Sequence, residues 1–102
     1  MANVDAAVMA AMRRKCGYFE PESSMDARVE DAIIAASPRI ASLLGHSSNH
    51  EFKVTDEDWW LFENGCFYEY SDAFDDFEHN YAGAIMSTRL KNLGAQDAQA
   101  QG

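Results

Sequence analysis

An aromatic and acidic segment in the second half of the chain, from Thr55 to Leu93, constrains the fold more than any other feature. Apolar residues, most of them aromatic, recur in it every three or four positions, which is the spacing of one face of a helix. Two such helical patterns meet at a short break, Tyr70-Ser71-Asp72. The segment therefore predicts helices that pack through aromatic side chains. We expect a small protein of this kind to use its surface for assembly rather than for catalysis.

The length and the charge of the chain narrow the classes of function. A chain of 102 residues predicts one domain with a small core, so oligomerisation is a natural way to enlarge its buried area. It carries 8 Lys and Arg against 17 Asp and Glu, for a formal net charge of -9. Proteins that grip phosphate backbones need a basic face, so this balance argues against such binding.

The number of cysteines and the hydropathy of the chain indicate the cellular compartment. The two cysteines, Cys16 and Cys66, predict no disulfide framework, although a single disulfide is left open. The N-terminal basic cluster follows the apolar stretch instead of preceding it, so no signal peptide is expected. No apolar run approaches the roughly 20 residues of a membrane span. These features predict a cytosolic protein with reduced thiols and no membrane partner.

The first predicted helix begins near Val4. It ends in a basic last turn, Arg13-Arg14-Lys15, where cations complement the helix dipole, and Gly17 is its expected stop. This basic triplet is more simply explained by the dipole than by a binding patch. Gly45 is expected to end the second helix, as Gly17 ends the first.

The second predicted helix begins at Ser23 and Asp26, which have the spacing of a capping box, and its apolar stripe continues to Leu44. Pro38 lies inside this helix and removes one backbone hydrogen bond. We expect a kink there, because the apolar stripe keeps its phase across the proline. The alternative is a new short helix that Ser37 caps.

A loop is predicted over residues 46–54, with a short strand considered at 51–54. Thr55 and Asp58 repeat the capping-box spacing, so a third helix is expected from Asp56 to Tyr70. Carboxylates in its first turn suit the helix N-terminus.

Gly65 lies in the middle of the third helix and predicts a close approach of a neighbouring helix. Ser71 is the expected cap of a fourth helix over Asp72–Asn92, which should end near Gly94. The chain thus predicts an all-α fold, a small bundle of about four helices formed by residues 1–93.

The C-terminal segment is small and polar and holds no core-forming residue. Its composition predicts an extended arm that is disordered unless a partner surface holds it. The arm comprises Gly94, Ala95, Gln96, Asp97, Ala98, Gln99, Ala100, Gln101 and Gly102.

Few residues form patterns typical of metal sites. Asp75 and His79 lie four apart, a spacing that can present two metal ligands, but no second pair accompanies them. A solvated helix face is the favoured interpretation. His46 and His50 flank a serine-rich loop and offer too few ligands for zinc. We therefore expect no metal and no cofactor.

Catalytic signatures are also missing from the sequence. It contains no phosphate-binding loop, no dinucleotide fingerprint and no nucleophile elbow. Cys66 lies within the aromatic stripe, where a small buried hydrophobe is its default role. Cys16 follows basic residues and could have a lowered pKa, yet no acyl-transfer signature accompanies it. These observations predict that the protein is not an enzyme.

The aromatic residues are interpreted as core or subunit interface, because they lie beside acids and not among bases. Trp59 and Trp60 are adjacent, so their side chains point about 100° apart on a helix. One can enter the core while the other faces a neighbouring subunit. The predicted interface residues are Trp59, Trp60, Tyr68 and Tyr70.

Nine acids and no Lys or Arg occur between positions 56 and 80. One interpretation is a solvated surface that favours solubility. The other is a negative field that repels DNA or imitates it. The residues expected on this acidic face, or on the wall of a channel, are Glu69, Asp72, Asp75 and Asp76.

The segment Tyr68–Tyr81, YEYSDAFDDFEHNY, resembles the aromatic helix–break–helix segment of the head–tail connector proteins of tailed bacteriophages, also called adaptor or head-completion proteins. In these proteins a tyrosine-rich helix ends at a short break, and the next helix carries an aromatic every three to four residues. The pattern of the helix over Asp26–Leu44 is also similar. The resemblance covers about residues 26–93.

The resemblance implies an all-α subunit of a ring, usually of twelve copies. Such a ring docks beneath the portal protein, binds a tail or stopper protein, and lets double-stranded DNA pass through its centre. A C-terminal arm such as residues 94–102 is implied to insert into the portal. The implied location is the neck of the virion, after assembly in the host cytoplasm. A negative channel would suit this role, because DNA must slide without sticking.

Two other functions remain open from the sequence. The net charge of -9 and the base-free acidic stretch also suit a DNA-mimic protein that inhibits a nucleic-acid enzyme. A metal-dependent enzyme that uses Asp75 and His79 is the remote third hypothesis.

Overall fold

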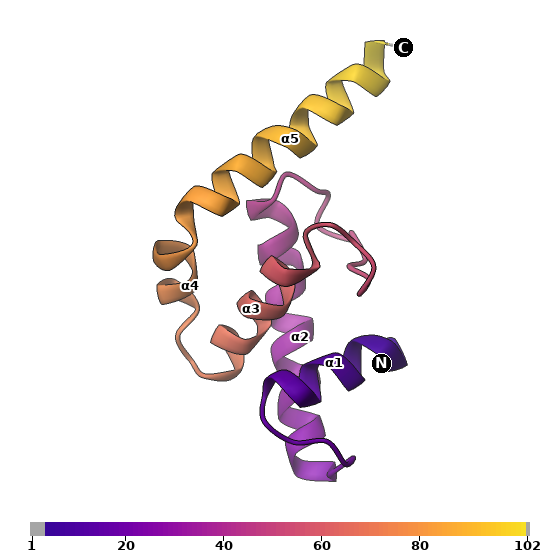
Figure 1. The fold of residues 1–102 in the computed structure, drawn as a ribbon, viewed down its shortest axis with the longest axis vertical. Helices are drawn as coiled ribbons and strands as arrows, with labels where there is room; N and C mark the ends of the chain where they lie inside the picture. Colours follow the sequence, from indigo (N-terminus) through magenta and orange to yellow (C-terminus); the bar gives the residue numbers. More distant parts are fainter. Residues whose placement is uncertain (1–3, 102) are drawn as a thin grey trace.

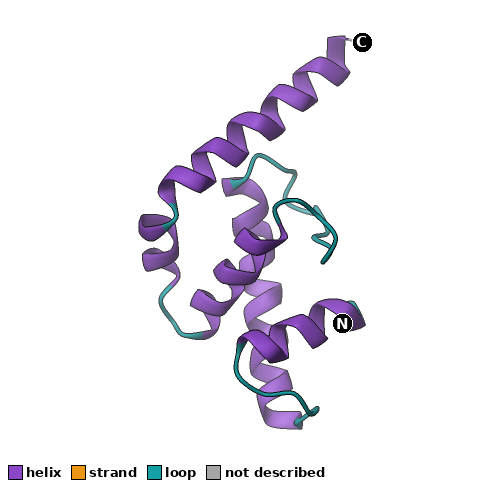
Figure 2. Cartoon of the chain, in the orientation of Figure 1, coloured by secondary structure: helices purple, strands orange, loops and turns teal. Residues whose placement is uncertain are grey.

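The computed structural model describes the backbone of residues 4–101 and the side chains of residues 4–95. These residues form helices and loops and no strand (Figure 2). In chain order the helices are α1 (Ala6–Lys15), α2 (Ser23–Leu43), α3 (Trp59–Tyr70), α4 (Phe74–Asn80) and α5 (Ala82–Gln101). The all-α expectation is confirmed. The described residues, however, hold five helices where the sequence predicted about four.

Helix α2 is the central support of the fold (Figure 1). It packs most extensively against α3, and α1 packs against both. Helix α4 covers α3 on another side, whereas α5 contacts α4 and α2 near its own N-terminal half and then extends beyond the other helices (Figure 1). The body of the protein is therefore α1–α4, and α5 projects from it.

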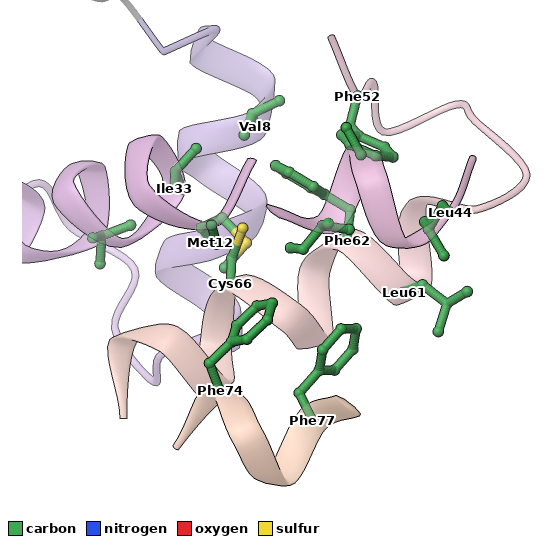
Figure 3. Packing of buried hydrophobic residues seen from close by; sticks show 14 of the residues in the cluster. Val8, Met12, Ile33, Leu44, Phe52, Leu61, Phe62, Cys66, Phe74 and Phe77 are labelled. Carbon is green, nitrogen blue, oxygen red and sulfur yellow. The ribbon is translucent and has the colours of Figure 1, made fainter. Parts of the chain in front are cut away.

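The core is apolar and rich in aromatic residues. Figure 3 shows side chains from α1, α2 and α3 meeting in one cluster, with Phe74 and Phe77 of α4 pointing toward Cys66. Phe77 and Cys66 are fully buried. Among the described residues no polar or charged residue is buried. Burial of this apolar surface is the main stabilising term of a domain of this size.

The helix ends in the first half are set by acids and glycines. Asp5 caps α1, and its Oδ1 accepts hydrogen bonds from the backbone N–H groups of Ala7 (2.8 Å) and Val8 (3.3 Å). Gly17 and Gly45 follow α1 and α2 with φ of 95° and 82°, a conformation that favours glycine. The expected glycine stops are confirmed.

The predicted capping box of α2 is wrong. Glu22 caps the helix, because its carboxylate accepts the N–H groups of Ser24 (3.3 Å) and Met25 (2.7 Å). Asp26 is engaged elsewhere. Its carboxylate accepts two hydrogen bonds from Arg13 of α1, at 3.0 and 2.9 Å, and one from the hydroxyl of Tyr18, at 2.5 Å. Asp26 thus joins α1 and the following loop to the start of α2.

Helix α2 continues through Pro38 without a break, as the phase of its stripe predicted. The alternative of a new helix capped by Ser37 is wrong, because the Ser37 hydroxyl donates to the carbonyl of Ile33 (2.5 Å), one turn back along the same helix. The size of the expected kink remains a prediction.

The second half differs from the sequence prediction at several boundaries. Helix α3 begins at Trp59 and not at Asp56, and residues 51–54 are not a strand. The expected fourth helix is two helices, because the chain leaves helical geometry at Tyr81, where φ is -112° and ψ is 17°. Phe77 and Ile85 are buried on both sides of this break. The apolar stripe keeps its spacing across the break, so periodicity could not reveal it.

The predicted end of the last helix at Gly94 is also wrong, since α5 continues to Gln101. A glycine inside a helix costs about 1 kcal/mol but does not end it. The residues after it include Ala95, Ala98 and Ala100, and no proline. Alanine has the highest helix propensity, so this sequence favours continuation.

Gly65 marks the closest contact between α3 and α2, as predicted. A Cβ at this position would lie 2.5 Å from Cδ1 of Ile40 and 3.2 Å from Cε2 of Phe77, both fully buried side chains. We expect Gly65→Ala to lower the free energy of unfolding by about 1–3 kcal/mol, because the methyl group forces the fully buried Ile40 side chain to shift inside the core. Urea denaturation measures the change.

Gly83 provides the matched control for this substitution. A Cβ at Gly83 meets nothing within 4 Å, and the residue is helical. Gly83→Ala should therefore raise stability by about 0.5–1 kcal/mol through lower chain entropy in the unfolded state. Equal effects at both glycines would contradict the close crossing at Gly65.

The carboxylate of Asp26 should make stability depend on acid pH. Hydrogen bonds from Arg13 and then Tyr18 lower the pKa of Asp26 from 3.8 to about 2. The ionised Asp26 carboxylate therefore stabilises the folded state fully above pH 3.8, and this stabilisation is lost as the pH falls toward 2. We expect Asp26→Asn to flatten this part of the stability profile, measured by denaturation at successive pH values. Asp31→Asn, an exposed change on the same helix, should keep the wild-type slope.

Candidate functional site

Of the predicted interface aromatics, Tyr68 lies beside α4 and the residue that follows it, Tyr81. Tyr68 is half-buried, with ring centroids 6.0 Å from Phe77 and 5.8 Å from Tyr81. The Tyr81 hydroxyl donates to Asn64 Oδ1 at 3.3 Å. Tyr68 therefore supports the packing of its own chain. Its role between subunits remains a prediction.

The two tryptophans divide as their spacing predicted. Trp59 is half-buried, its ring centroid lies 5.3 Å from that of Phe62, and its Nε1 donates to Glu63 at 3.1 Å. Trp60 is 47% exposed, with its ring 6.1 Å from that of Tyr81. Trp60 is thus the tryptophan that another molecule can reach.

Cations from α2 lie over aromatic rings at the end of α3 and the start of α4. The Arg28 guanidinium lies 4.6 Å from the ring centroid of Tyr70, and the Arg39 guanidinium lies 3.9 Å from that of Phe74. Arg39 also pairs with Glu69 at 2.9 Å. Glu69 is therefore partly neutralised inside its own chain. Sequence reasoning missed these contacts, because no local spacing links residues that lie 30 to 42 positions apart.

The other acids predicted for a channel or acidic face lie at the start of α4. Asp72, Asp75 and Asp76 are exposed, and within the described residues none of them forms an ion pair. Asp72 has a φ of 58°, which is tolerated by Asp in tight turns. Asp75 and Asp76 occupy the first turn of α4. The structure leaves three carboxylates together in solvent.

The metal-ligand spacings do not assemble a site. Within the part of the chain that the structure describes, no three His, Cys, Asp or Glu side chains are placed to hold an ion. Asp75 and His79 are both exposed on α4. The two cysteines are free. Burial raises the pKa of Cys66, and it also raises that of Cys16 against the opposing effect of Arg28 and Lys15, so the lowered pKa considered for Cys16 is wrong.

A histidine cluster, which the sequence did not reveal as a unit, lies between the α2–α3 loop and α5. The rings of His46 and His50 stack at 3.7 Å with an interplanar angle of 3°, and Phe52 meets both edge-on. Asp58 accepts from His46 Nε2 at 2.8 Å. This explains why Asp58, the residue before α3, makes no capping hydrogen bond.

Helix α5 is attached to this region by a few polar contacts. Asn92 donates to the carbonyl of Leu44 at 2.7 Å and lies 3.2 Å from His46 Nε2. Arg89 donates to the carbonyl of Ser42 at 3.0 Å, and Lys91 pairs with Glu57. Most of these partners belong to the end of α2 or to the loop, so the position of α5 depends on them.

The outer face of α5 is apolar at two positions one turn apart. Met86 is 55% exposed and Leu90 is 62% exposed. They lie on the helix that projects from the body (Figure 1). The predicted arm begins beyond them at Gly94, and side chains after Ala95 fall outside the described residues. This face has the character of a contact surface.

Three hollows are lined in part by the histidine cluster. One, of about 520 Å³, lies between the start of α1, the middle of α2 and the loop around His50, and its apolar wall includes Val8, Ile34 and Phe52. A second, of about 320 Å³, lies beside α5 and includes Trp60 and Lys91, and a third, of about 590 Å³, includes Ser42 and Arg89. Among the described residues, no serine or threonine hydroxyl lining them is hydrogen-bonded to a histidine, the arrangement typical of nucleophilic catalysis.

Comparisons with protein-family models, with curated proteins and with solved structures found no match to this chain. Within the described residues, no helix is both long and apolar enough to cross a membrane.

The unequal burial of the tryptophans can be tested by truncation. We expect Trp59→Ala to cost about 2 kcal/mol of unfolding free energy, because it removes packing on Phe62. Trp60→Ala should cost less than about 1 kcal/mol, because Trp60 is 47% exposed and is not among the core residues. Denaturation monitored by circular dichroism measures both. A larger loss at Trp60 would show that its contact with Tyr81 dominates.

Proposed function

We propose that this chain is a structural subunit of a phage head–tail connector ring, which docks on the portal protein and continues the DNA channel toward the tail. The proposal rests on α5, a 20-residue helix whose exposed Met86 and Leu90 extend an apolar face away from the body. A helix of this kind suits insertion into a groove of a larger protein, where its apolar residues act as anchors.

The shape of the subunit supports this assignment. Helix α5 joins the core only near its start, through the buried Ile85, so the rest of α5 can contact a partner without unfolding α1–α4. A helix that rests on the body along part of its length gains stability when a partner covers it. In the proposed assembly the portal covers the end of α5, including residues 94–102, and a tail or stopper protein binds the opposite side of the ring.

The proposed ring uses contacts between neighbouring copies, about twelve in all, arranged head to tail. Trp60 is the best candidate anchor because it is the exposed aromatic of the predicted interface set. Trp59, Tyr68 and Tyr70 pack against the core of their own chain, so they would act mainly within the subunit.

The exposed carboxylates suit a channel wall. Asp72, Asp75 and Asp76 form no ion pair among the described residues, so they would give a negative surface along which DNA passes without binding. Glu69 contributes less, because Arg39 pairs with it. In this function the protein has no enzymatic activity, and it resides in the virion neck after assembly in the host cytoplasm.

A substitution on α5 tests the docking step. Leu90→Glu should abolish co-sedimentation with the portal protein of the same phage genome, because it places a charge on the apolar face. Its circular dichroism spectrum should match wild type, since Leu90 is exposed. Ser87→Glu, an exposed change on the same helix, is the matched control and should leave portal binding intact.

Negative-stain imaging of the portal complex then tests the assembly. A ring of this chain beneath the portal is the expected result. Wild-type protein that neither binds the portal nor forms a ring would contradict the proposal. Unchanged binding by Leu90→Glu would contradict the role of α5.

A DNA-mimic protein is the second candidate, and the exposed acids at the start of α4 favour it. It predicts that the free protein displaces DNA from a nucleic-acid enzyme in a salt-sensitive manner. Replacing Asp72, Asp75 and Asp76 together by Asn should remove this competition if the candidate is correct. The same triple variant should still bind the portal under the connector proposal.

A further inference from the structure

One of the contacts between α5 and the body involves the stacked histidines. His46 carries a carboxylate partner, Asp58, at 2.8 Å, and it lies 3.2 Å from Asn92 of α5. His50 stacks on the other face of His46, at 3.7 Å between ring centroids. Its Nε2 is buried and has no hydrogen-bond partner in the protein. The two rings therefore differ, because His46 has a carboxylate partner and the buried nitrogen of His50 has none.

We propose that the His46–His50 stack is a pH-sensitive latch, which holds α5 against the end of α2 when His50 is neutral and releases it when His50 takes a proton. This inference does not depend on the proposed function. It follows from the position of the stack between the loop and the helix.

A proton on His50 is unfavourable in the latched structure for two reasons. The ring is enclosed by His46 and by Phe52, whose centroid is 4.7 Å away, so a charged imidazole would lose solvation. A charge on His46 would also lie within stacking distance. Burial first, and His46 second, lower the pKa of His50 from its ordinary value of 6.5.

The surrounding charges do not cancel this effect. Asp58, Asp56 and Glu51 each act to raise the pKa of His50, yet the direction of the shift stays downward. Charged groups line the hollows around His50 from the start of α1, from the loop and from α5: they are Asp5, Glu51, Lys53, Asp56, Glu57, Asp58, Arg89 and Lys91.

Release of α5 is the expected way for a protonated His50 to regain solvent and move away from His46. Separating the rings moves the loop segment that holds His46, and with it the Leu44 carbonyl and His46 ring that Asn92 contacts. The contacts of Arg89 and Lys91 with the same region are exposed and weak individually. Opening should therefore expose the part of α5 that follows Ile85, while Ile85 stays buried in the core with Phe77.

The sign of the pH dependence follows from the lowered pKa. Above pH 6.5 His50 is neutral in both the latched and the open state, so proton binding does not favour opening there. Below this value the open state binds a proton that the latched state resists. The open fraction should then rise by up to about tenfold for each pH unit, because one proton is linked to opening.

Amide hydrogen exchange of the full chain between pH 7.5 and 5.5 tests the latch, after correction for the intrinsic pH dependence of exchange. Peptides covering residues 82–93 should gain exchange on acidification relative to peptides covering residues 29–41 of α2. His50→Phe, which keeps an aromatic ring and cannot titrate, should remove this gain. His79→Gln, a change of the exposed histidine on α4, is the matched control and should retain it.

Two exchange results would contradict the latch. A wild-type exchange ratio that stays constant with pH would overturn it, and so would a gain that persists in His50→Phe. NMR titration of the wild-type histidine Cε1–H signals supplies a measurement that needs no variant. The His50 signal should have a midpoint below 6.5, and a midpoint at or above that value would also overturn the proposal.

Discussion

The contact at Gly65 holds the two halves of the fold together. Because this residue has no side chain, α3 lies directly on α2, and a Cβ there would stand 2.5 Å from Ile40. The same crossing brings Phe77 of α4 within 3.2 Å of that position. The absence of a Cβ at Gly65 thus lets α2, α3 and α4 share a single core. Helix α5 follows α4 in the chain, so the position of α4 sets where α5 begins.

The packing of the helices decides which acidic side chains have a basic neighbour. The base-free stretch on α3 and α4 packs against α2, which supplies Arg28 and Arg39 over aromatic rings and an ion pair to Glu69. Asp72, Asp75 and Asp76 lie beyond the reach of these cations among the described residues. The negative surface relevant to either proposed function is therefore smaller than the sequence suggests and is concentrated at the start of α4.

Sequence reasoning succeeded where the physical cause is local. The glycine stops at Gly17 and Gly45, the close approach at Gly65, and the division between Trp59 and Trp60 follow from backbone conformation and helical spacing. It failed where several local solutions are nearly equal in energy. Glu22 caps α2 in place of Ser23, and Tyr81 breaks an apolar stripe that keeps its spacing on both sides.

The sequence by itself determined that the chain is helical, because apolar side chains at spacings of three and four can be buried together only on a helix. Tertiary structure alone decided which charges are neutralised and how α5 is attached. The Arg39–Glu69 pair and the contacts of Asn92 with Leu44 and His46 join residues far apart along the chain. Such pairs are set by how helices pack against one another, and no periodicity within one segment encodes them.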